Sequence, residues 1–301
     1  MTEISSIVLP EERSRPIRFI KILLFSASIM PAMVAGALAR AYGRADGSDW
    51  ALATLGLLLG QAGADYLYYR FTHYHTDSRD AHTRIFAGWR PLFIGGPLRN
   101  EHSLPAGILC LSAALIVGVY FFMQAGTPVL WFVLAGGIVS VFFTPLMMRG
   151  LKEPVIFITF GPLCVSGVDF VLTRQLRLEP FVASLPVGFL VTLVAYLKGA
   201  RYRVIEDGGS EVILNLKPRV AAILLILAYA TLAMSPVSRH LPPWALLGLI
   251  SLPFSWLFWR RLQRQKRIAD YLWATVHSLV IFIATCLFMA FGILLSTAAQ
   301  E

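Results

Sequence analysis

Two stretches of the sequence place charged side chains directly beside long apolar segments. In the first, Asp65 lies near the end of an apolar run. A carboxylate at such a position is costly to bury in a membrane and is usually functional when it faces a bundle interior. The other interpretation is that Asp65 lies at the membrane interface and only caps its helix. We favour a functional carboxylate.

The second stretch reads YLKGARYRVIEDGGSEVILNLKPR, from Tyr196 to Arg219. It places Lys198 and Arg201 close to Glu206 and Asp207. Such cations can bind a diphosphate, and a carboxylate can hold Mg²⁺, which usually takes one or two carboxylates together with phosphate oxygens. The other interpretation is the ordinary excess of cations on the cytoplasmic side of membrane proteins, followed by a glycine turn.

A polar segment after Asp65 carries a further cluster of possible metal ligands. Its members are His73, His75, His82, Asp77 and Asp80. Histidines beside carboxylates can bind zinc or iron, but this spacing matches no closed metal motif. We interpret the cluster as a solvated loop face, with Mg²⁺ as the second interpretation and a transition metal as the third.

The composition indicates what kind of protein positions these residues. Hydrophobic residues make up 57% of the 301 residues and charged residues 14%, whereas soluble domains carry about 25% charged residues. Disorder is excluded, because it requires low hydrophobicity. The formal charge of +9 comes from cations placed between apolar runs, where they face lipid headgroups, so we expect membrane lipids and no nucleic acid as partners. The chain is predicted to be an integral, multi-pass membrane protein.

Nine segments are predicted to be transmembrane helices, since a span needs about 20 apolar residues. They are Phe19–Ala39, Trp50–Tyr69, Leu104–Phe122, Val129–Met147, Pro154–Leu172, Phe181–Leu197, Val220–Met234, Trp244–Trp259 and Leu272–Leu295. No separate soluble domain is visible, so the predicted fold class is an all-α bundle of nine helices that forms one domain over residues 1–301. Asp169, in the fifth segment, is expected to face the bundle interior or a wet cavity.

The distribution of lysine and arginine predicts the orientation in the membrane. If the N-terminus is cytoplasmic, the outward loops hold five of the 26 cations, namely Arg40, Arg44, Arg174, Arg177 and Arg239. The other cations fall on the inward side, as the positive-inside rule requires. We therefore predict a cytoplasmic N-terminus, most simply in a bacterial inner (plasma) membrane. The long inward loops after the second and sixth helices are predicted to form the site.

Several stretches together resemble a known family. They are RPIRFIKILLFSASIMPAMVAGALA (Arg15–Ala39), IFAGWRPLFIGG (Ile85–Gly96), LKEPVIFITFGPLCVSGVDFVLT (Leu151–Thr173) and SLPVGFLVTLVAYL (Ser184–Leu197). Over nearly its whole length the chain resembles the UbiA-type intramembrane prenyltransferase superfamily. It is most similar to the dihydroxynaphthoate polyprenyltransferase branch of the menaquinone pathway. The resemblance implies nine helices and two Asp-rich motifs that hold Mg²⁺ and a prenyl diphosphate.

The chain departs from the family at its first Asp-rich motif. The family has an Asn, an Asp four residues later and a further Asp three or four residues on. Here these positions are Gln61, Asp65, and Tyr68 or Tyr69. One carboxylate of the motif is therefore kept. In the loop that follows, Asp77 resembles a family Asp and Arg90 resembles the Arg of a Gly-Ser-Arg stretch.

The second motif is altered further. The family's Asn, Asp and Asp, spaced by four residues, correspond here to Lys198, Tyr202 and Glu206. Tyrosine cannot replace a carboxylate as a magnesium ligand, whereas lysine can bind phosphate as a point charge. We therefore expect Mg²⁺ as the cofactor. Its contribution to binding the diphosphate is expected to be reduced or altered compared with the family.

The resemblance implies a role for each matching residue. The catalytic residues would be Asp65, Tyr69 and Tyr202, with tyrosine rings stabilising an allylic cation. The diphosphate-binding residues would be Gln61, Arg70, Arg90, Lys198 and Arg201. The metal ligands would be Asp65, Asp77 and Glu206. The implied enzyme joins a prenyl diphosphate to an aromatic quinone precursor or another lipid-precursor acceptor. The alternatives are a degenerate, non-catalytic isoprenoid- or quinone-binding protein and a terpene cyclase of the same fold.

Overall fold

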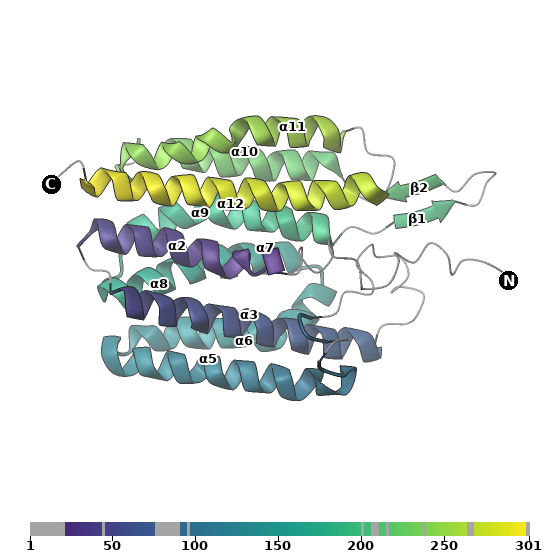
Figure 1. Cartoon of the computed structure of the whole chain (residues 1–301), viewed down its shortest axis with the longest axis horizontal. Coiled ribbons are helices and arrows are strands. Elements are labelled where there is room, and N and C mark those ends of the chain that lie inside the picture. The colour runs from purple at the N-terminus through teal and green to yellow at the C-terminus, as the bar shows by residue number, and fades with distance from the viewer. Residues whose placement is uncertain are drawn as a thin grey trace.

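The computed structural model describes residues 22–43, 46–75, 91–94, 97–199, 202–205, 211–214, 217–237, 239–263 and 268–298. Within these residues the chain forms a bundle of helices with one short β-hairpin (Figure 1). The helices are α2 (Ser26–Ala41), α3 (Gly47–His75), η2 (Asn100–His102), α5 (Ser103–Ala125), α6 (Pro128–Met148), α7 (Lys152–Ile158), η3 (Thr159–Leu163), α8 (Cys164–Thr173), α9 (Leu178–Lys198), α10 (Pro218–Met234), η4 (Pro243–Ser251), α11 (Leu252–Leu262) and α12 (Ile268–Ala298). The strands are β1 (Tyr202–Ile205) and β2 (Glu211–Leu214).

All nine predicted segments are helical where the structure describes them. Among the described residues, five helical segments are long and apolar enough to cross a membrane: Asn100–Ala125, Pro128–Met148, Lys152–Thr173, Leu178–Lys198 and Trp273–Thr297. Helix α10 is a shorter apolar helix. The chain is thus an all-helical membrane bundle apart from the hairpin, while the count of nine spans and the side of the N-terminus stay predictions.

Two local predictions were wrong. Helix α3 continues to His75, whereas we placed the start of the loop at Arg70, because polar side chains at the end of a membrane helix do not stop helical hydrogen bonding. The segment after α9 was predicted as a charged loop. It contains two antiparallel strands in which Tyr202 pairs with Leu214 and Ile205 with Glu211.

The bundle has two distinct ends (Figure 1). Successive spans run in opposite directions, with α7, η3 and α8 forming one span and η4 and α11 another. We call the end next to β1 and β2 the hairpin end and the other the far end. Lys152 and Lys198 lie at the hairpin end, where α7 begins and α9 ends, whereas Arg40 and Arg174 lie at the far end, after α2 and α8. The two ends therefore carry the cations that we assigned to opposite sides of the membrane.

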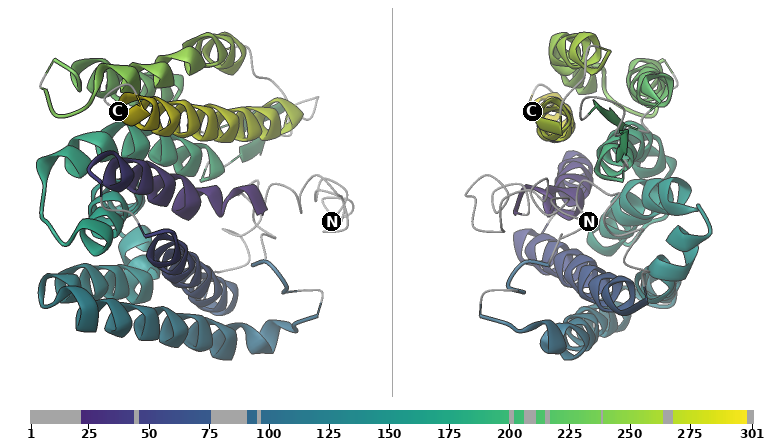
Figure 2. Two further views of the ribbon diagram at one scale, coloured as in Figure 1. Left: turned by 60° about the vertical axis from the view of Figure 1, so that its left-hand side comes forward. Right: turned by 90° about the vertical axis from the view of Figure 1, so that its right-hand side faces the viewer.

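Helices α5 and α6 form one side of the bundle, and α10 and α11 the other, as Figure 2 shows in two further views. Large apolar side chains on the outer surface of α5 and α6 are exposed, among them Met123 (81%) and Trp131 (72%). Apolar area of this kind is stable on the outside of a bundle when lipid covers it.

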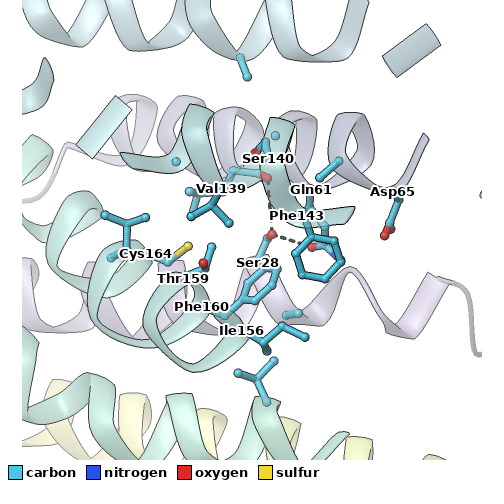
Figure 3. A pocket seen from close by; sticks show the side chains of 18 of the residues that line it. Ser28, Gln61, Asp65, Val139, Ser140, Phe143, Ile156, Thr159, Phe160 and Cys164 are labelled. Atoms are coloured by element: carbon cyan, nitrogen blue, oxygen red, sulfur yellow. Dashed lines mark hydrogen bonds between the residues drawn. The ribbon is translucent and has the colours of Figure 1, made fainter. Parts of the chain in front are cut away.

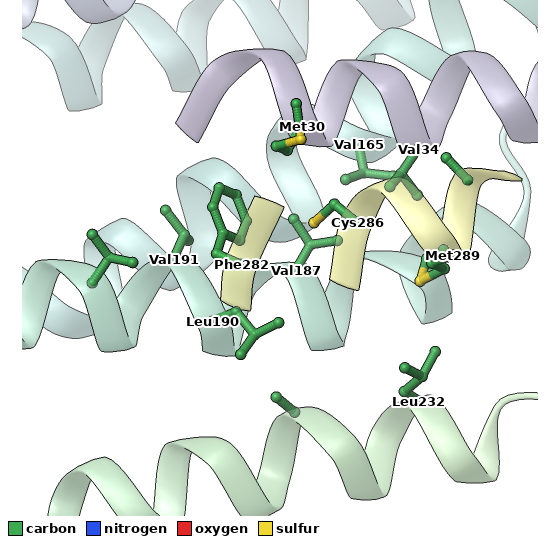
Figure 4. Packing of buried hydrophobic residues seen from close by; sticks show 14 of the residues in the cluster. Met30, Val34, Val165, Val187, Leu190, Val191, Leu232, Phe282, Cys286 and Met289 are labelled. Atoms are coloured by element: carbon green, nitrogen blue, oxygen red, sulfur yellow. The ribbon is translucent and has the colours of Figure 1, made fainter. Parts of the chain in front are cut away.

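The main core lies between α2, α8, α9, α10 and α12 (Figure 4). Val34 of α2, Val187 and Leu190 of α9, and Phe282 and Met289 of α12 are almost fully buried there. Helix α9 packs against α10, α12 and η3, so it forms the centre of the structure.

Small residues bring the helices around α9 into close contact. A Cβ atom on Gly161 would lie 3.0 Å from the Cα atom of Gly188, and one on Gly188 would lie 2.9 Å from the ring of Phe157. Gly161 belongs to η3, a π-helical turn that also contains Pro162. Proline lacks a backbone N–H, and π turns inside helices are frequent at functional sites. Here the turn directs Thr159 and Phe160 into the cavity described next.

Candidate functional site

A large cavity of about 720 Å³ lies between α2, α3, α5, α6, the α7–η3–α8 segment and α9. Its lining residues on α3 extend from Ala53 to Tyr69, which corresponds to about 24 Å of helix at about 1.5 Å per residue. The hydrocarbon core of a bilayer is about 30 Å thick. The cavity therefore runs through most of the depth of the bundle, from the hairpin end toward the far end.

The part of the cavity toward the far end is apolar. Its walls include Ala53, Phe121, Val129, Phe132, Val133 and Gly136. These side chains offer no hydrogen-bonding group, so this part suits a hydrocarbon chain and excludes charged groups.

Polar side chains appear in the middle of the cavity (Figure 3). The hydroxyl of Ser28 donates to Oε1 of Gln61 at 2.6 Å, and Nε2 of Gln61 donates to the carbonyl of Leu24 at 3.1 Å. Both ends of the Gln61 amide are thus bonded within the protein, which fixes its orientation. Thr159 also faces this region, and its hydroxyl donates to the carbonyl of Val155 at 2.7 Å.

The hairpin end of the cavity carries its charged groups. Asp65 of α3, Lys198 of α9, and Lys152 and Glu153 of α7 all line it. Asp65 and Lys198 interact electrostatically across the cavity. Both side chains are half-buried, and opposite charges at such positions stabilise one another more than they would in bulk water.

Lys152 is fixed against the end of α9. Its Nζ donates to the carbonyl of Ala195 at 2.5 Å and lies beside Gly199, where a Cβ atom would clash with it. The ammonium group therefore sits where the last carbonyls of α9 carry partial negative charge. Gly199 is exposed and follows Lys198 directly, so the two lysines belong to one region.

The structure brings together four of the residues that the sequence predicted for the site. They are Gln61, Asp65, Tyr69 and Lys198, all of which line the cavity. Arg70 follows Tyr69 on α3 but is not a lining residue. Tyr202 lies in β1, and its side chain is not among those described. Asp77, Arg90, Arg201 and Glu206 lie outside the described residues.

Sequence reasoning missed three residues of the charged end: Tyr68, Lys152 and Glu153. We mentioned Tyr68 only as a replaced motif position. Lys152 and Glu153 directly precede Pro154, within a stretch that carried the family resemblance. We counted Lys152 as an ordinary inward cation. Two adjacent charges at the start of an apolar helix were the signal that could have identified them.

Asp169 has a separate, structural explanation. Its side chain is 1% exposed and forms an ion pair with Arg177, in which Nε of Arg177 donates to Oδ2 at 3.3 Å. The guanidinium also lies 4.0 Å above the ring centre of Tyr42. Asp169 faces the interior, as predicted, but its buried partner, and not a wet cavity, accounts for its position at the far end.

The described donor groups do not fit a two-magnesium site. Within the part of the chain that the structure describes, no three side chains of His, Cys, Asp and Glu lie close enough together to hold a metal ion. The position of the first motif's second Asp is occupied by tyrosine, and Asp65 shares its end of the cavity with the cation of Lys198.

The fold and the cavity define a helical membrane protein with an amphipathic internal site. A sequence profile of the UbiA prenyltransferase family matches residues 28–285, so the chain belongs to this family. Among solved structures, that of a digeranylgeranylglyceryl phosphate synthase superimposes with a TM-score of 0.53. The match covers 92% of this chain and 98% of the other at 11% sequence identity, and it shows the shared fold alone. A search of curated protein sequences finds no match.

Proposed function

We propose that this membrane prenyltransferase transfers a polyprenyl chain from a prenyl diphosphate to an aromatic quinone precursor. The observation that carries the proposal is the distribution of polarity in a single cavity, which is charged at the hairpin end and apolar toward the far end. A prenyl diphosphate has the same distribution. Its head would lie beside Lys198, and its chain would extend toward Val129.

The reaction would proceed through an allylic cation. The bond between C1 of the prenyl chain and the diphosphate oxygen breaks, and the electron pair leaves with the diphosphate. A carbon of the electron-rich acceptor then forms a bond to C1, and the acceptor loses a proton. The cation requires surroundings that exclude water, which the apolar walls provide.

Each described side chain at the hairpin end has a proposed role. Lys198 would bind the leaving diphosphate, and Asp65 would hold Lys198 in place. Tyr69 would face the allylic cation with its ring, since aromatic rings attract cations. Gln61, with both ends of its amide bonded, would fix the wall of the cavity one helical turn deeper than Asp65.

The remaining residues of the implied site are part of the proposal by resemblance. Arg70, Arg90 and Arg201 would add positive charge around the diphosphate, and Tyr202 would lie near the cation. Asp77 and Glu206 would be the positions for a magnesium ion. The acceptor class follows the resemblance to the dihydroxynaphthoate branch, and a bacterial inner membrane is the proposed location.

An assay with purified protein tests the proposal. Geranylgeranyl diphosphate and 1,4-dihydroxy-2-naphthoate are incubated with the protein, and prenylated product and free diphosphate are measured. We expect both products from the unmodified chain and a loss of at least about a hundredfold for Asp65→Asn, because that substitution removes the charge that positions Lys198. Asp46→Asn, at an exposed position before α3, is the matched control and should keep full activity.

The altered motifs favour one alternative, a non-catalytic isoprenoid- or quinone-binding protein. Two tyrosines stand where the first motif ends, and these cannot act as carboxylates. Binding of a prenyl diphosphate without product, for several acceptors, would support this alternative. Release of diphosphate with a cyclised hydrocarbon and no acceptor would support a terpene cyclase.

A further inference from the structure

The positive charge at the head of the cavity comes from the protein itself. Asp65 would be a metal ligand in an Asp-rich motif, yet in this chain it shares the hairpin end of the cavity with Lys198 of α9, close enough for the two charges to interact. Lys198 lies where the family has an Asn, so it is an added cation. The carboxylate on one motif and the cation on the other therefore line the same end of one cavity.

A second lysine reaches the same region from another helix. Lys152, at the start of α7, is fixed by its bond to the carbonyl of Ala195, one turn before Lys198. Both lysines line the cavity. They are attached to packed helices, α7 and α9, which contact each other directly. Their positions are therefore set by the fold, which reduces the entropy lost when a ligand binds.

We propose that Lys198 and Lys152 form a lysine clamp for the diphosphate, in which Lys198, held by Asp65, takes the place of a magnesium ion. This inference rests on the proposed function, because it specifies how the same substrate is bound. Lysine is a compact cation that binds phosphate as a point charge with three N–H donors. In the family's motif, a metal ion lies between a carboxylate and the diphosphate. In the proposed site, the ammonium group of Lys198 lies between the carboxylate of Asp65 and the diphosphate.

The clamp is stable without its ligand. The charges of Lys152 and Lys198 are balanced by those of Asp65 and Glu153, which line the same end of the cavity. These four side chains are half-buried, and opposite charges that lie near one another at such positions stabilise each other. A site of this kind binds diphosphate through short, directed contacts, and chelation of divalent metal leaves those contacts intact.

The test is calorimetric binding of geranylgeranyl thiodiphosphate, which is not ionised, to the full-length protein in detergent. Each titration is run in magnesium and in EDTA. We expect a dissociation constant in EDTA within about tenfold of that in magnesium. Lys198→Met should weaken binding in EDTA by about tenfold or more. Lys217→Met is the matched control, since Lys217 is an exposed lysine near the same end, and it should bind like the unmodified chain.

Two further variants separate binding from folding. Lys198→Met leaves Asp65 without its cation, so thermal unfolding is recorded in parallel. The double variant Asp65→Asn, Lys198→Met removes both charges and should recover stability without recovering binding in EDTA. Lys198→Arg keeps the charge and should retain binding. Lys198→Asn, which restores the family residue, should make binding depend on magnesium.

The outcomes distinguish this inference from the proposed function. Binding by the unmodified chain that requires magnesium and disappears in EDTA would overturn the lysine clamp and leave the prenyltransferase proposal in place. Equal binding in EDTA by Lys198→Met and by the unmodified chain would do the same. No binding under either condition would overturn both.

Discussion

Gly136 of α6 offers a direct way to shorten the cavity. It lines the cavity, and a Cβ atom at this position would have no heavy atom within 4 Å. A phenylalanine there should fill cavity space without forcing the backbone to move. Glycine also weakens a helix interior by roughly 0.5–1 kcal/mol relative to alanine, so Gly136→Phe should not destabilise the fold.

The position of Gly136 sets the expected effect. It lies 11 residues from Met147, which lines the hairpin end of α6, or about 16 Å along the helix. An isoprenoid unit adds four bonds of about 1.5 Å each, so it advances about 5 Å. Roughly three units fit before the new side chain. A fourth unit contains five carbons, and excluding it from the apolar part of the cavity forfeits up to about 4 kcal/mol at about 0.8 kcal/mol per carbon.

Binding of two ligands that differ by one unit measures this effect. Dissociation constants of farnesyl and geranylgeranyl thiodiphosphate are compared for the unmodified chain and Gly136→Phe. We expect geranylgeranyl binding to weaken by about tenfold or more, and farnesyl binding to change by less than about threefold. Ile138→Phe introduces the same ring two residues away on the exposed side of α6 and should change neither. An equal loss for both ligands, or no loss for either, would refute the placement of the chain.

Three further predictions concern the framework of the bundle. Arg177→Met should lower the free energy of unfolding by about 3–5 kcal/mol, because it leaves the buried Asp169 unpaired, and adding Asp169→Asn should restore much of the loss; an unchanged unfolding midpoint for the single variant would contradict this. Gly188→Leu should destabilise the protein by about 1–3 kcal/mol, since its Cβ atom would lie 2.9 Å from the Phe157 ring, and normal stability by thermal unfolding would show that α7 and α9 are not so close. A cysteine at Arg174 should react with an impermeant reagent only from outside the cell, and labelling from the cytoplasm alone would reverse the proposed orientation.

The sequence predicted the helices well because the backbone of an apolar run of membrane length must satisfy its hydrogen bonds internally, and a helix does so. The predicted segments are helical where the structure describes them, and within the eighth the 3₁₀ turns of η4 give way to α11. The boundary at Arg70 was misplaced because polar residues can continue a helix beyond the membrane. The hairpin was missed because its two strands of four residues each were read only for their charges.

The site was only partly predictable. Motif spacing identified Asp65 and Lys198 separately, on helices far apart in the sequence. It could not show that they line the same end of one cavity, because that depends on how α3 and α9 pack around the cavity. The positions of Lys152 and Glu153 in the site depend on how a third helix, α7, packs beside the other two. The π turn that contains Pro162 has no signature in the periodicity, and Thr159 and Phe160 of this turn line the cavity.

A structure determined with bound geranylgeranyl thiodiphosphate tests the central claim most directly. The account predicts the diphosphate at the hairpin end, within hydrogen-bonding distance of Lys198 and beside Asp65, with the chain along α6 toward Val129. A diphosphate bound away from Lys198, or a prenyl chain lying outside the cavity, would contradict it.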